Sequence, residues 1–252
     1  MIKVFSDIEE LSNFAAETFI EIGNAAIEKL GQFSVVLAGG STPKSLYQLL
    51  AGENFKDKID WKSVYFFFGD ERNVLPDDKQ SNFLMAGESL LKPLQITDNQ
   101  IFRWQTELGD ATAIAANYEK IIGRVFNLEV NPPATAGGSD IFPHFDLILL
   151  GMGADGHTAS LFPETDALQE TEKIAVANWV EKLQDFRLTM TFPTINNASN
   201  IIFLVSGAEK AKTLKQVLHG RFQPEIFPSQ AVKPINGDLI WLIDEKAAQF
   251  LA

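Results

Sequence analysis

The sequence predicts an α/β protein with an open, mostly parallel sheet and helices on both of its faces. Short runs of apolar and β-branched residues alternate with segments that carry apolar residues at helical spacing, which is typical of βαβ units. Two runs, residues 64–68 and 146–150, are almost continuously apolar, as expected for strands that helices cover on both sides. At 252 residues we expect one domain over the whole chain, residues 1–252.

The pattern divides the chain into alternating elements. The β-rich runs that predict strands are residues 33–38, 64–68, 145–150, 174–180, 186–190, 201–205 and 239–243. The segments with helical spacing between them are residues 8–30, 43–50, 82–91, 110–126, 208–219 and 244–251. Two stretches, 131–145 and 222–234, lack periodicity and are rich in Pro, Gly and small polar residues, so we predict surface loops there that could cover a site.

The composition argues against several classes of function. There are 33 acidic and 21 basic residues, a net charge of -12, which speaks against nucleic acid or an anionic membrane as a partner. The N-terminal residues become acidic too early for a secretory signal, and no apolar run approaches the roughly 18 residues of a membrane span. We expect a soluble cytoplasmic protein, with which the absence of Cys is compatible.

Polar residues follow the predicted strands, at the edge where open parallel sheets bind ligands. After the strand at 33–38 come Gly39 and Gly40, then Ser41 and Thr42 at a helix N-cap, with Pro43 suited to the first turn. Free N–H groups and the helix dipole there favour a phosphate. A plain strand-turn-helix junction would also need a glycine and a cap, so both interpretations stay open.

Three charged residues, Asp70, Glu71 and Arg72, directly follow the apolar strand at 64–68. Such a cluster could bind sugar hydroxyls or orient a catalytic group. Taken in isolation, a surface ion pair between Arg72 and one of the two carboxylates is the simpler interpretation.

The strand at 145–150 runs into a glycine-rich loop, residues 151–157, which we call the glycine loop. Its glycines let the backbone turn sharply, and it carries Asp155 and His157. An imidazole can accept and return a proton near neutral pH. Of the other two His residues, His144 lies between prolines and His219 ends a predicted helix, so His157 is the best candidate for a general base.

Two cations, Arg187 and Lys210, lie on or after later strands and could neutralise a phosphate. Each alone would more often be a solvated surface charge. We predict no metal site, because no cluster of His or Cys has a metal-binding spacing. The chain also lacks a Gly-x-Ser-x-Gly elbow, so activated water is the expected nucleophile.

A set of motifs, in their order along the chain, resembles the motifs of the family that contains 6-phosphogluconolactonases and glucosamine-6-phosphate deaminases. The resemblance extends over nearly the whole chain. The motifs are Gly39-Gly-Ser-Thr-Pro43, Asp70-Glu-Arg72, Ser81-Asn82, Gly151-x-Gly-x-Asp-Gly-His-Thr-Ala-Ser-Leu-Phe-Pro163, Arg187-Leu-Thr and Ser206-Gly-x-x-Lys210-Ala. The lactonase side implies a Rossmann-like doubly wound domain that hydrolyses 6-phosphoglucono-δ-lactone in the oxidative pentose phosphate pathway, without a cofactor.

The resemblance also implies roles for residues. His157 would be the base, Asp70 and Arg72 would lie beside the lactone ring, and Gly39 would mainly give the phosphate room. The residues implied to hold the phosphate are Gly40, Ser41, Thr42, Arg187 and Lys210. For Asp155 two interpretations remain, orienting His157 or capping the loop, and the donors to the C1 oxygen are either Arg72 or loop N–H groups.

Two other functions are possible on this scaffold. Deaminases of the family continue after Asp-Gly-His with a motif whose Glu helps in proton transfer, and this chain has Phe162 at that position. A sugar-phosphate sensor without catalysis would need a further partner or DNA-binding segment, and the chain begins almost at once with its first predicted helix. Both observations favour a lactonase. We expect it to act as a monomer or small homo-oligomer.

Overall fold

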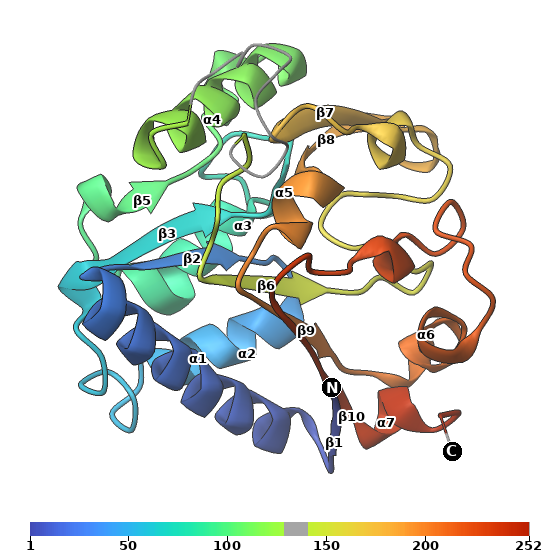
Figure 1. The fold of residues 1–252 in the computed structure, drawn as a ribbon, viewed down its shortest axis with the longest axis horizontal. Coiled ribbons are helices and arrows are strands. Elements are labelled where there is room, and N and C mark those ends of the chain that lie inside the picture. The colour runs from blue at the N-terminus through green and yellow to red at the C-terminus, as the bar shows by residue number, and fades with distance from the viewer. Residues whose placement is uncertain (129–140, 252) are drawn as a thin grey trace.

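The computed structural model describes residues 1–128 and 141–251. Its centre is a seven-stranded sheet in which all neighbouring strands are parallel, in the order β1-β10-β9-β6-β2-β3-β5 (Figure 1). In that order the strands are Ile2–Phe5, Asp238–Asp244, Asn200–Val205, Leu147–Gly151, Phe33–Leu37, Val64–Phe68 and Ile101–Phe102. The predicted fold class, an α/β protein built on a mostly parallel sheet, is confirmed.

A second, three-stranded sheet corrects one part of the prediction. β4 (Asp70–Arg72), β8 (Asp185–Met190) and β7 (Ala175–Val180) pair antiparallel in the order β4-β8-β7. The runs at 174–180 and 186–190 therefore do not belong to the parallel sheet. The physical reason is the short connection between them, since a parallel crossover needs a dozen or more residues.

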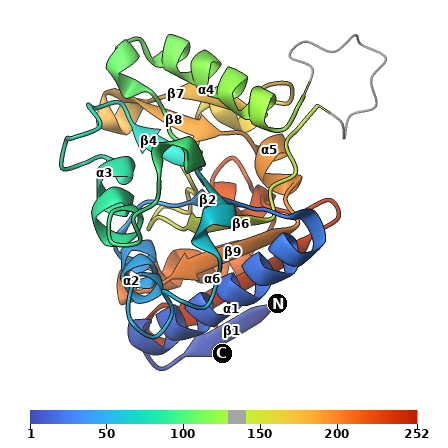
Figure 2. The same cartoon turned by 90° about the vertical axis from the view of Figure 1, so that its left-hand side faces the viewer.

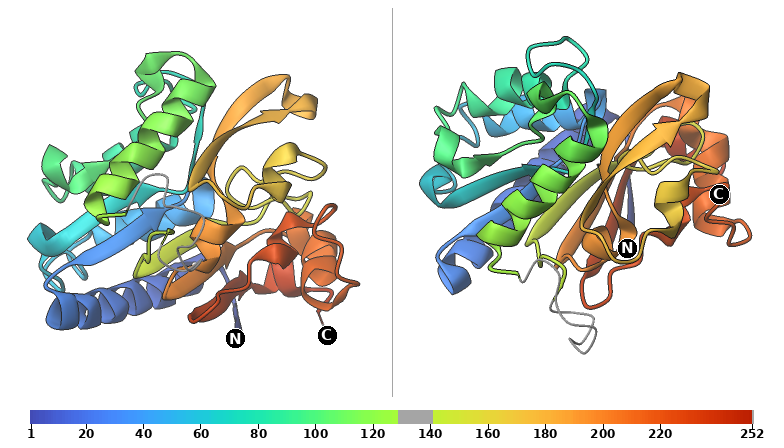
Figure 3. Two further views of the ribbon diagram at one scale, coloured as in Figure 1. Left: turned by 45° about the horizontal axis from the view of Figure 1, so that its top comes forward. Right: turned by 90° about the horizontal axis from the view of Figure 1, so that it is seen from above.

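Helices lie on both sides of the large sheet, with α1 and α2 on one side and α4 with the small sheet on the other (Figures 1 and 2). Seen from above, α4 runs alongside the β7–β8 hairpin (Figure 3). The α-helices are α1 (Ile8–Leu30), α2 (Ser41–Leu50), α3 (Asn82–Ala86, continued by a π turn over Gly87–Leu91), α4 (Ala111–Val125), α5 (Phe192–Asn196), α6 (Ala211–His219) and α7 (Glu245–Ala248). No helix among the described residues is long and apolar enough to cross a membrane.

The helix ends follow local chemistry that the sequence carries. Asp7 caps α1 by accepting hydrogen bonds from Glu9 and Glu10, and Gly31 closes the same helix at φ 77°. Asp110 caps α4 in the same way as Asp7 caps α1. The edge strands β1 and β5 were not predicted, because each is short and only partly buried.

The two predicted loops differ in outcome. Residues 131–140 of the first lie outside the described part of the chain. The second, 222–234, is not wholly a surface loop, since it contains a 3-10 turn at Pro228–Ala231 in which Ser229 and Gln230 are buried. This turn packs behind the glycine loop, as described below.

Candidate active site

A pocket of about 250 Å³ lies at the carboxyl ends of β2, β3, β6 and β9. This is the edge at which open parallel sheets bind ligands. Eight of the ten residues predicted for the site line this pocket, namely Gly39, Gly40, Ser41, Thr42, Asp70, Arg72, His157 and Lys210. The other two, Asp155 and Arg187, do not line it.

One wall of the pocket is the N-terminus of α2. The helix begins at Ser41, so Gly40 is its N-cap and Ser41 and Thr42 occupy the first helical positions rather than the cap. Gly40 has φ 104°, a conformation that glycine adopts readily, and no side chain caps the helix. The N–H groups of this first turn and the helix dipole are therefore available to an anion in the pocket.

Gly39 has a close neighbour that the sequence did not indicate. A Cβ atom added at Gly39 would lie 2.0 Å from Asn82 Oδ1, which is buried and has no hydrogen-bond partner among the described residues. The space beside Gly39 is thus filled by Asn82. The glycine accommodates this side chain.

Asp70 is held at the pocket by neutral donors. Its carboxylate accepts hydrogen bonds from Ser160 Oγ at 2.7 Å and from Asn82 Nδ2 at 3.2 Å. Asp70 is only 9% exposed and forms no ion pair within the described residues. Two segments distant in sequence therefore fix this carboxylate in a position where it can meet sugar hydroxyls.

The neighbouring Glu71 and Arg72 do not form the surface ion pair that the sequence favoured. Glu71 is buried and accepts from Ser81 Oγ and from the backbone N–H groups of Arg72, Asn82 and Phe83. Burial raises the pKa of Glu71 despite these hydrogen bonds. Arg72 donates instead to the carbonyl of Gln80 and lines the pocket.

The glycine loop turns tightly after β6. Gly153 N–H donates to the His157 carbonyl at 2.9 Å, and Gly156 N–H donates back to the Gly153 carbonyl at 3.0 Å. A Cβ atom on Gly153 would lie 2.1 Å from Cε1 and 2.2 Å from Nδ1 of His157. Gly153 is therefore the residue that lets the imidazole pack against the loop backbone.

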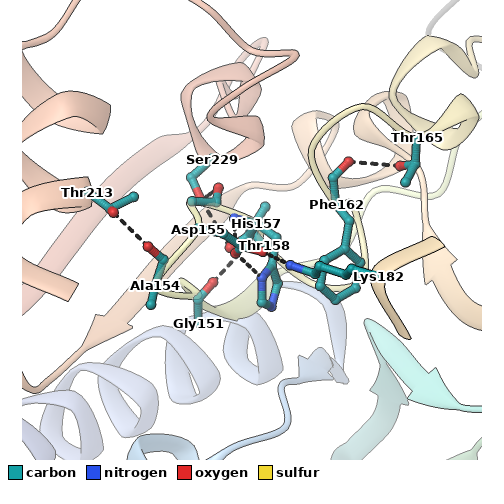
Figure 4. Close-up of polar contacts among 11 residues, drawn as sticks. Gly151, Ala154, Asp155, His157, Thr158, Phe162, Thr165, Lys182, Thr213 and Ser229 are labelled. Atoms are coloured by element: carbon teal, nitrogen blue, oxygen red, sulfur yellow. Dashed lines mark hydrogen bonds and ion pairs between the residues drawn. The ribbon is translucent and has the colours of Figure 1, made fainter. Parts of the chain in front are cut away.

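Asp155 and His157 form a pair, as Figure 4 shows. His157 Nδ1 lies 2.5 Å from Asp155 Oδ1, and the His157 N–H donates to the same oxygen at 3.2 Å. The imidazole also stacks on Phe162, with 4.1 Å between ring centroids. A carboxylate can only accept, so in the neutral imidazole Nδ1 carries the proton and Nε2 keeps a free lone pair. Of the two roles left open for Asp155, orienting His157 is the one that this geometry supports.

The ionisation of Asp155 suits this role. Burial by itself raises its pKa, but the hydrogen bonds and charge of His157 and the contact with Lys182 outweigh burial, and they hold the pKa of Asp155 well below its usual range. Asp155 is therefore a carboxylate at every pH at which the protein would work. It remains an acceptor toward the ring nitrogen.

Other segments brace the glycine loop from behind (Figure 4). Thr213 Oγ1 donates to the Ala154 carbonyl at 2.6 Å, and Ser229 donates to the Gly156 carbonyl through Oγ at 2.8 Å and through its backbone N–H at 2.9 Å. Thr158 Oγ1 donates to the Gly151 carbonyl at 2.9 Å. The loop is thus fixed by α6 and by the 3-10 turn after residue 222, and His157 is presented on a rigid support.

Lys210 and Arg187 differ in their access to the pocket. Lys210 lines the pocket and forms no ion pair among the described residues, while burial lowers its pKa against the opposing effects of Glu209 and Asp244. Arg187 lies within β8, opposite Arg72 on β4, and its guanidinium is 2.7 Å from Asp185. Arg187 is therefore one strand away from the pocket and already paired.

Some pocket residues carried no role in the sequence analysis. Asn82 was part of a motif without a role, yet it lines the pocket and holds Asp70. Ala159 also lines the pocket and has φ 47°, which is unusual for a residue with a side chain. The motif Ser81-Asn82 was the sequence signal for Asn82, whereas nothing in the sequence indicated the conformation of Ala159.

The pocket brings together the Nε2 atom of the His157 imidazole, the N-terminus of α2 with its free N–H groups, and the ammonium of Lys210. No three His, Asp or Glu side chains among the described residues are grouped to hold a metal ion. Asp70 is the only carboxylate among the pocket's described lining residues. Such a site is suited to binding a small phosphorylated molecule and moving a proton to or from water beside it.

Comparisons with known proteins agree with this description. The model of the family glucosamine-6-phosphate isomerases/6-phosphogluconolactonase matches residues 6–241. The 6-phosphogluconolactonase of Nostoc sp. is 40% identical over 230 residues, which cover 91% of this chain and 89% of that protein.

Solved structures are also similar. A 6-phosphogluconolactonase from Trypanosoma cruzi has a TM-score of 0.85 and 30% identity, and the match covers 100% of this chain and 96% of that one. A monomeric glucosamine-6-phosphate deaminase has a TM-score of 0.78 and 23% identity over 98% of each chain. That second likeness shows the fold alone, so the fold does not separate the two activities.

Proposed function

This chain belongs to the family of glucosamine-6-phosphate isomerases and 6-phosphogluconolactonases, and on that premise we propose that it hydrolyses 6-phosphoglucono-δ-lactone to 6-phosphogluconate. The reaction belongs to the oxidative pentose phosphate pathway. The observation that carries the proposal is the His157 imidazole in the pocket wall, with Nδ1 bound to Asp155 and Nε2 unbound by any described residue.

In the proposed mechanism His157 Nε2 takes a proton from a water molecule as that water attacks C1 of the lactone. The C1–O double bond opens to an oxyanion. When the tetrahedral intermediate collapses, the bond from C1 to the ring oxygen breaks, and the imidazolium returns the proton to that oxygen. General base catalysis of this kind contributes about 10² to 10⁴ in rate.

The phosphate would bind at the N-terminus of α2, between the N–H groups of Gly40, Ser41 and Thr42 and the ammonium of Lys210. Both features line the pocket and neither is engaged by an acidic side chain among the described residues. Arg187 would act at longer range, because reaching the pocket requires it to leave Asp185. Anchoring the phosphate at one end of the substrate places C1 at a defined distance from His157.

The remaining charged residues would bind the lactone ring. Asp70 is held by neutral donors and can accept hydrogen bonds from ring hydroxyls. Arg72 is the one guanidinium in the described pocket lining, and its position favours it as a donor to the C1 oxyanion.

The lactonase is favoured over the deaminase by what surrounds His157. The ring that stacks on the imidazole is Phe162, which cannot transfer a proton and stands where the deaminases of the family have Glu. A sensor without catalysis would not need an oriented imidazole in its pocket, so the pocket does not favour that role. A cytoplasmic location, the absence of a nucleic-acid partner and a monomeric or small homo-oligomeric state stay predictions from the sequence.

One assay tests this proposal. The protein is incubated with freshly prepared 6-phosphogluconolactone and with glucosamine 6-phosphate, and acid release and ammonia release are followed after subtracting spontaneous hydrolysis. We expect acid release only, and we expect it to fall by about 10² or more in His157→Ala. Ammonia release by the wild-type protein, or near wild-type acid release by His157→Ala, would overturn the proposal.

A further inference from the structure

The turn between β7 and β8 reaches the pair of Asp155 and His157 from the second sheet. Lys182, in the 3-10 turn Glu181–Leu183, contacts Asp155 Oδ2 with its Nζ atom. The same ammonium lies 4.7 Å from the ring centroid of Phe162, the ring that stacks on His157 (Figure 4). One side chain therefore contacts two of the groups that hold the imidazole.

We propose that Lys182 is a positioning residue for the general base. By binding Asp155 Oδ2 it keeps Oδ1 aligned with His157 Nδ1, so that the neutral imidazole carries its proton on Nδ1 and offers Nε2 to water. This inference rests on the proposed function for its catalytic consequence, but the effect on the imidazole itself is independent of any substrate.

The hydrogen bonds of Asp155 support this role. Oδ1 is bound twice, by the backbone N–H and by the ring of His157. Oδ2 has Lys182 as its one partner among the described residues. The Asp155 side chain is 31% exposed, so without Lys182 the carboxylate could turn toward water and lose its alignment with the ring. Both oxygens must be held for the orientation to be fixed.

The turn that carries Lys182 is itself held in place. Gln184, at φ 49°, donates through Nε2 to the carbonyl and to Oε1 of Glu181, at 2.9 and 2.7 Å. Trp179 Nε1 donates to the other carboxylate oxygen of Glu181 at 2.8 Å. Lys182 is therefore presented from a structured turn, and the hairpin acts as a lateral support for the glycine loop.

The position of Lys182 also predicts what it does not do. Its side chain is 51% exposed, and an ion pair this exposed contributes little to stability because solvent screens it. Lys182 does not line the pocket, so it should not bind substrate. A loss of Lys182 should therefore lower kcat while leaving both KM and the melting temperature nearly unchanged.

The direct test reads the tautomer of His157. Protein labelled with ¹⁵N in its histidine rings is examined by NMR at a pH where imidazoles are neutral, and the His157 signals are assigned by their loss in His157→Gln. We expect a single tautomer protonated at Nδ1 in the wild type and a mixture in Lys182→Met. Lys182→Arg, which keeps the charge and can reach the carboxylate, should restore the wild-type signals.

Kinetics and a matched control complete the test. In Lys182→Met we expect kcat to fall about tenfold, a smaller loss than the roughly 10² that a 1 Å misplacement costs, with KM unchanged. The control is Lys58→Met, because Lys58 also lies 4.7 Å from a phenylalanine ring, that of Phe55, but pairs with no acidic side chain among the described residues. It should change neither readout.

An unchanged single Nδ1 tautomer together with an unchanged kcat in Lys182→Met would overturn the inference. If the wild-type protein hydrolyses no lactone yet Lys182→Met mixes the tautomers, the proposed function fails and the positioning role stands. The two claims are thus separable by the same set of proteins.

Discussion

Replacing Gly153 by Ala should remove most of the activity while leaving the protein folded. The added Cβ atom would lie 2.1 Å from Cε1 and 2.2 Å from Nδ1 of His157, and 2.8 Å from Asp155 Oδ1. Moving the ring from 2.1 Å out to the 3.4 Å of ordinary contact requires a shift of about 1.3 Å. A shift of this size breaks the 2.5 Å contact between His157 and Asp155.

The expected loss follows from that displacement. A misplacement of about 1 Å at a reacting group costs roughly 10² in rate, so we expect kcat of Gly153→Ala to fall by about that factor. Gly153 does not have a positive φ, and the His157 side chain is 28% exposed, so the ring can swing outward. The free energy of unfolding should therefore change by less than about 1 kcal/mol.

Initial rates of lactone hydrolysis and urea unfolding curves measure the two effects. Gly87→Ala is the control, because a Cβ atom at Gly87 meets nothing within 4 Å and its φ is not positive. A folded Gly153→Ala protein with wild-type kcat would refute the reasoning, since it would mean that the imidazole needs neither this packing nor the contact with Asp155.

Three further predictions concern the rest of the site. In Gly39→Ala the new methyl must displace the buried Asn82, so we expect a loss of about 1 to 3 kcal/mol in the free energy of unfolding together with a lower kcat. Lys210→Met should raise KM by about 10-fold or more, and Arg187→Met should raise it less, because only Lys210 lines the pocket. Asp155→Asn should lower kcat by about 10² or more, as an incorrectly oriented histidine would. It should also make the free energy of unfolding depend less on pH in the acidic range.

The sign of the last effect follows from the direction of the pKa shift. The pKa of Asp155 is lower in the folded protein than its ordinary value, so the carboxylate stabilises the fold above that ordinary value, and this contribution is lost as pH falls toward the folded pKa. Chemical unfolding at a series of acidic pH values measures it. An identical pH dependence in the acidic range in Asp155→Asn and wild type would contradict the assignment.

The other two predictions have their own contrary outcomes. Equal stability of Gly39→Ala and wild type would show that Asn82 has room to move, against the 2.0 Å approach. A larger KM increase in Arg187→Met than in Lys210→Met would mean that Arg187 leaves Asp185 and takes the phosphate. Each comparison needs only steady-state kinetics on the lactone and an unfolding curve.

Local chemistry in the sequence was sufficient for most of the large sheet. The continuously apolar run at 64–68 predicted a strand covered on both sides, and it became β3. The helices predicted at 8–30 and 110–126 begin within one residue of α1 and α4, where Asp7 and Asp110 satisfy free N–H groups. The short strands β1 and β5 escaped prediction because edge strands carry too few buried residues to produce a pattern.

Strand direction needed more than the composition of the strands. Apolar alternation is the same in a parallel and an antiparallel strand, so the runs at 174–180 and 186–190 were assigned to the wrong sheet. Asp70, Glu71 and Arg72 were predicted only to follow the strand at 64–68, and they form a further strand, β4. Charged residues form a strand here because β8 pairs with them and α3 supplies N–H groups to Glu71.

For the site, the sequence by itself determined most of the chemical groups that line the pocket. Gly40, Ser41, His157 and Lys210 follow parallel strands of one sheet, and the carboxyl ends of such strands share one edge, so convergence on one pocket follows from topology. What only the tertiary structure decided is which neighbours each group has. Pairing partners such as Lys182 come from another sheet, and their contacts depend on distances that no local pattern encodes.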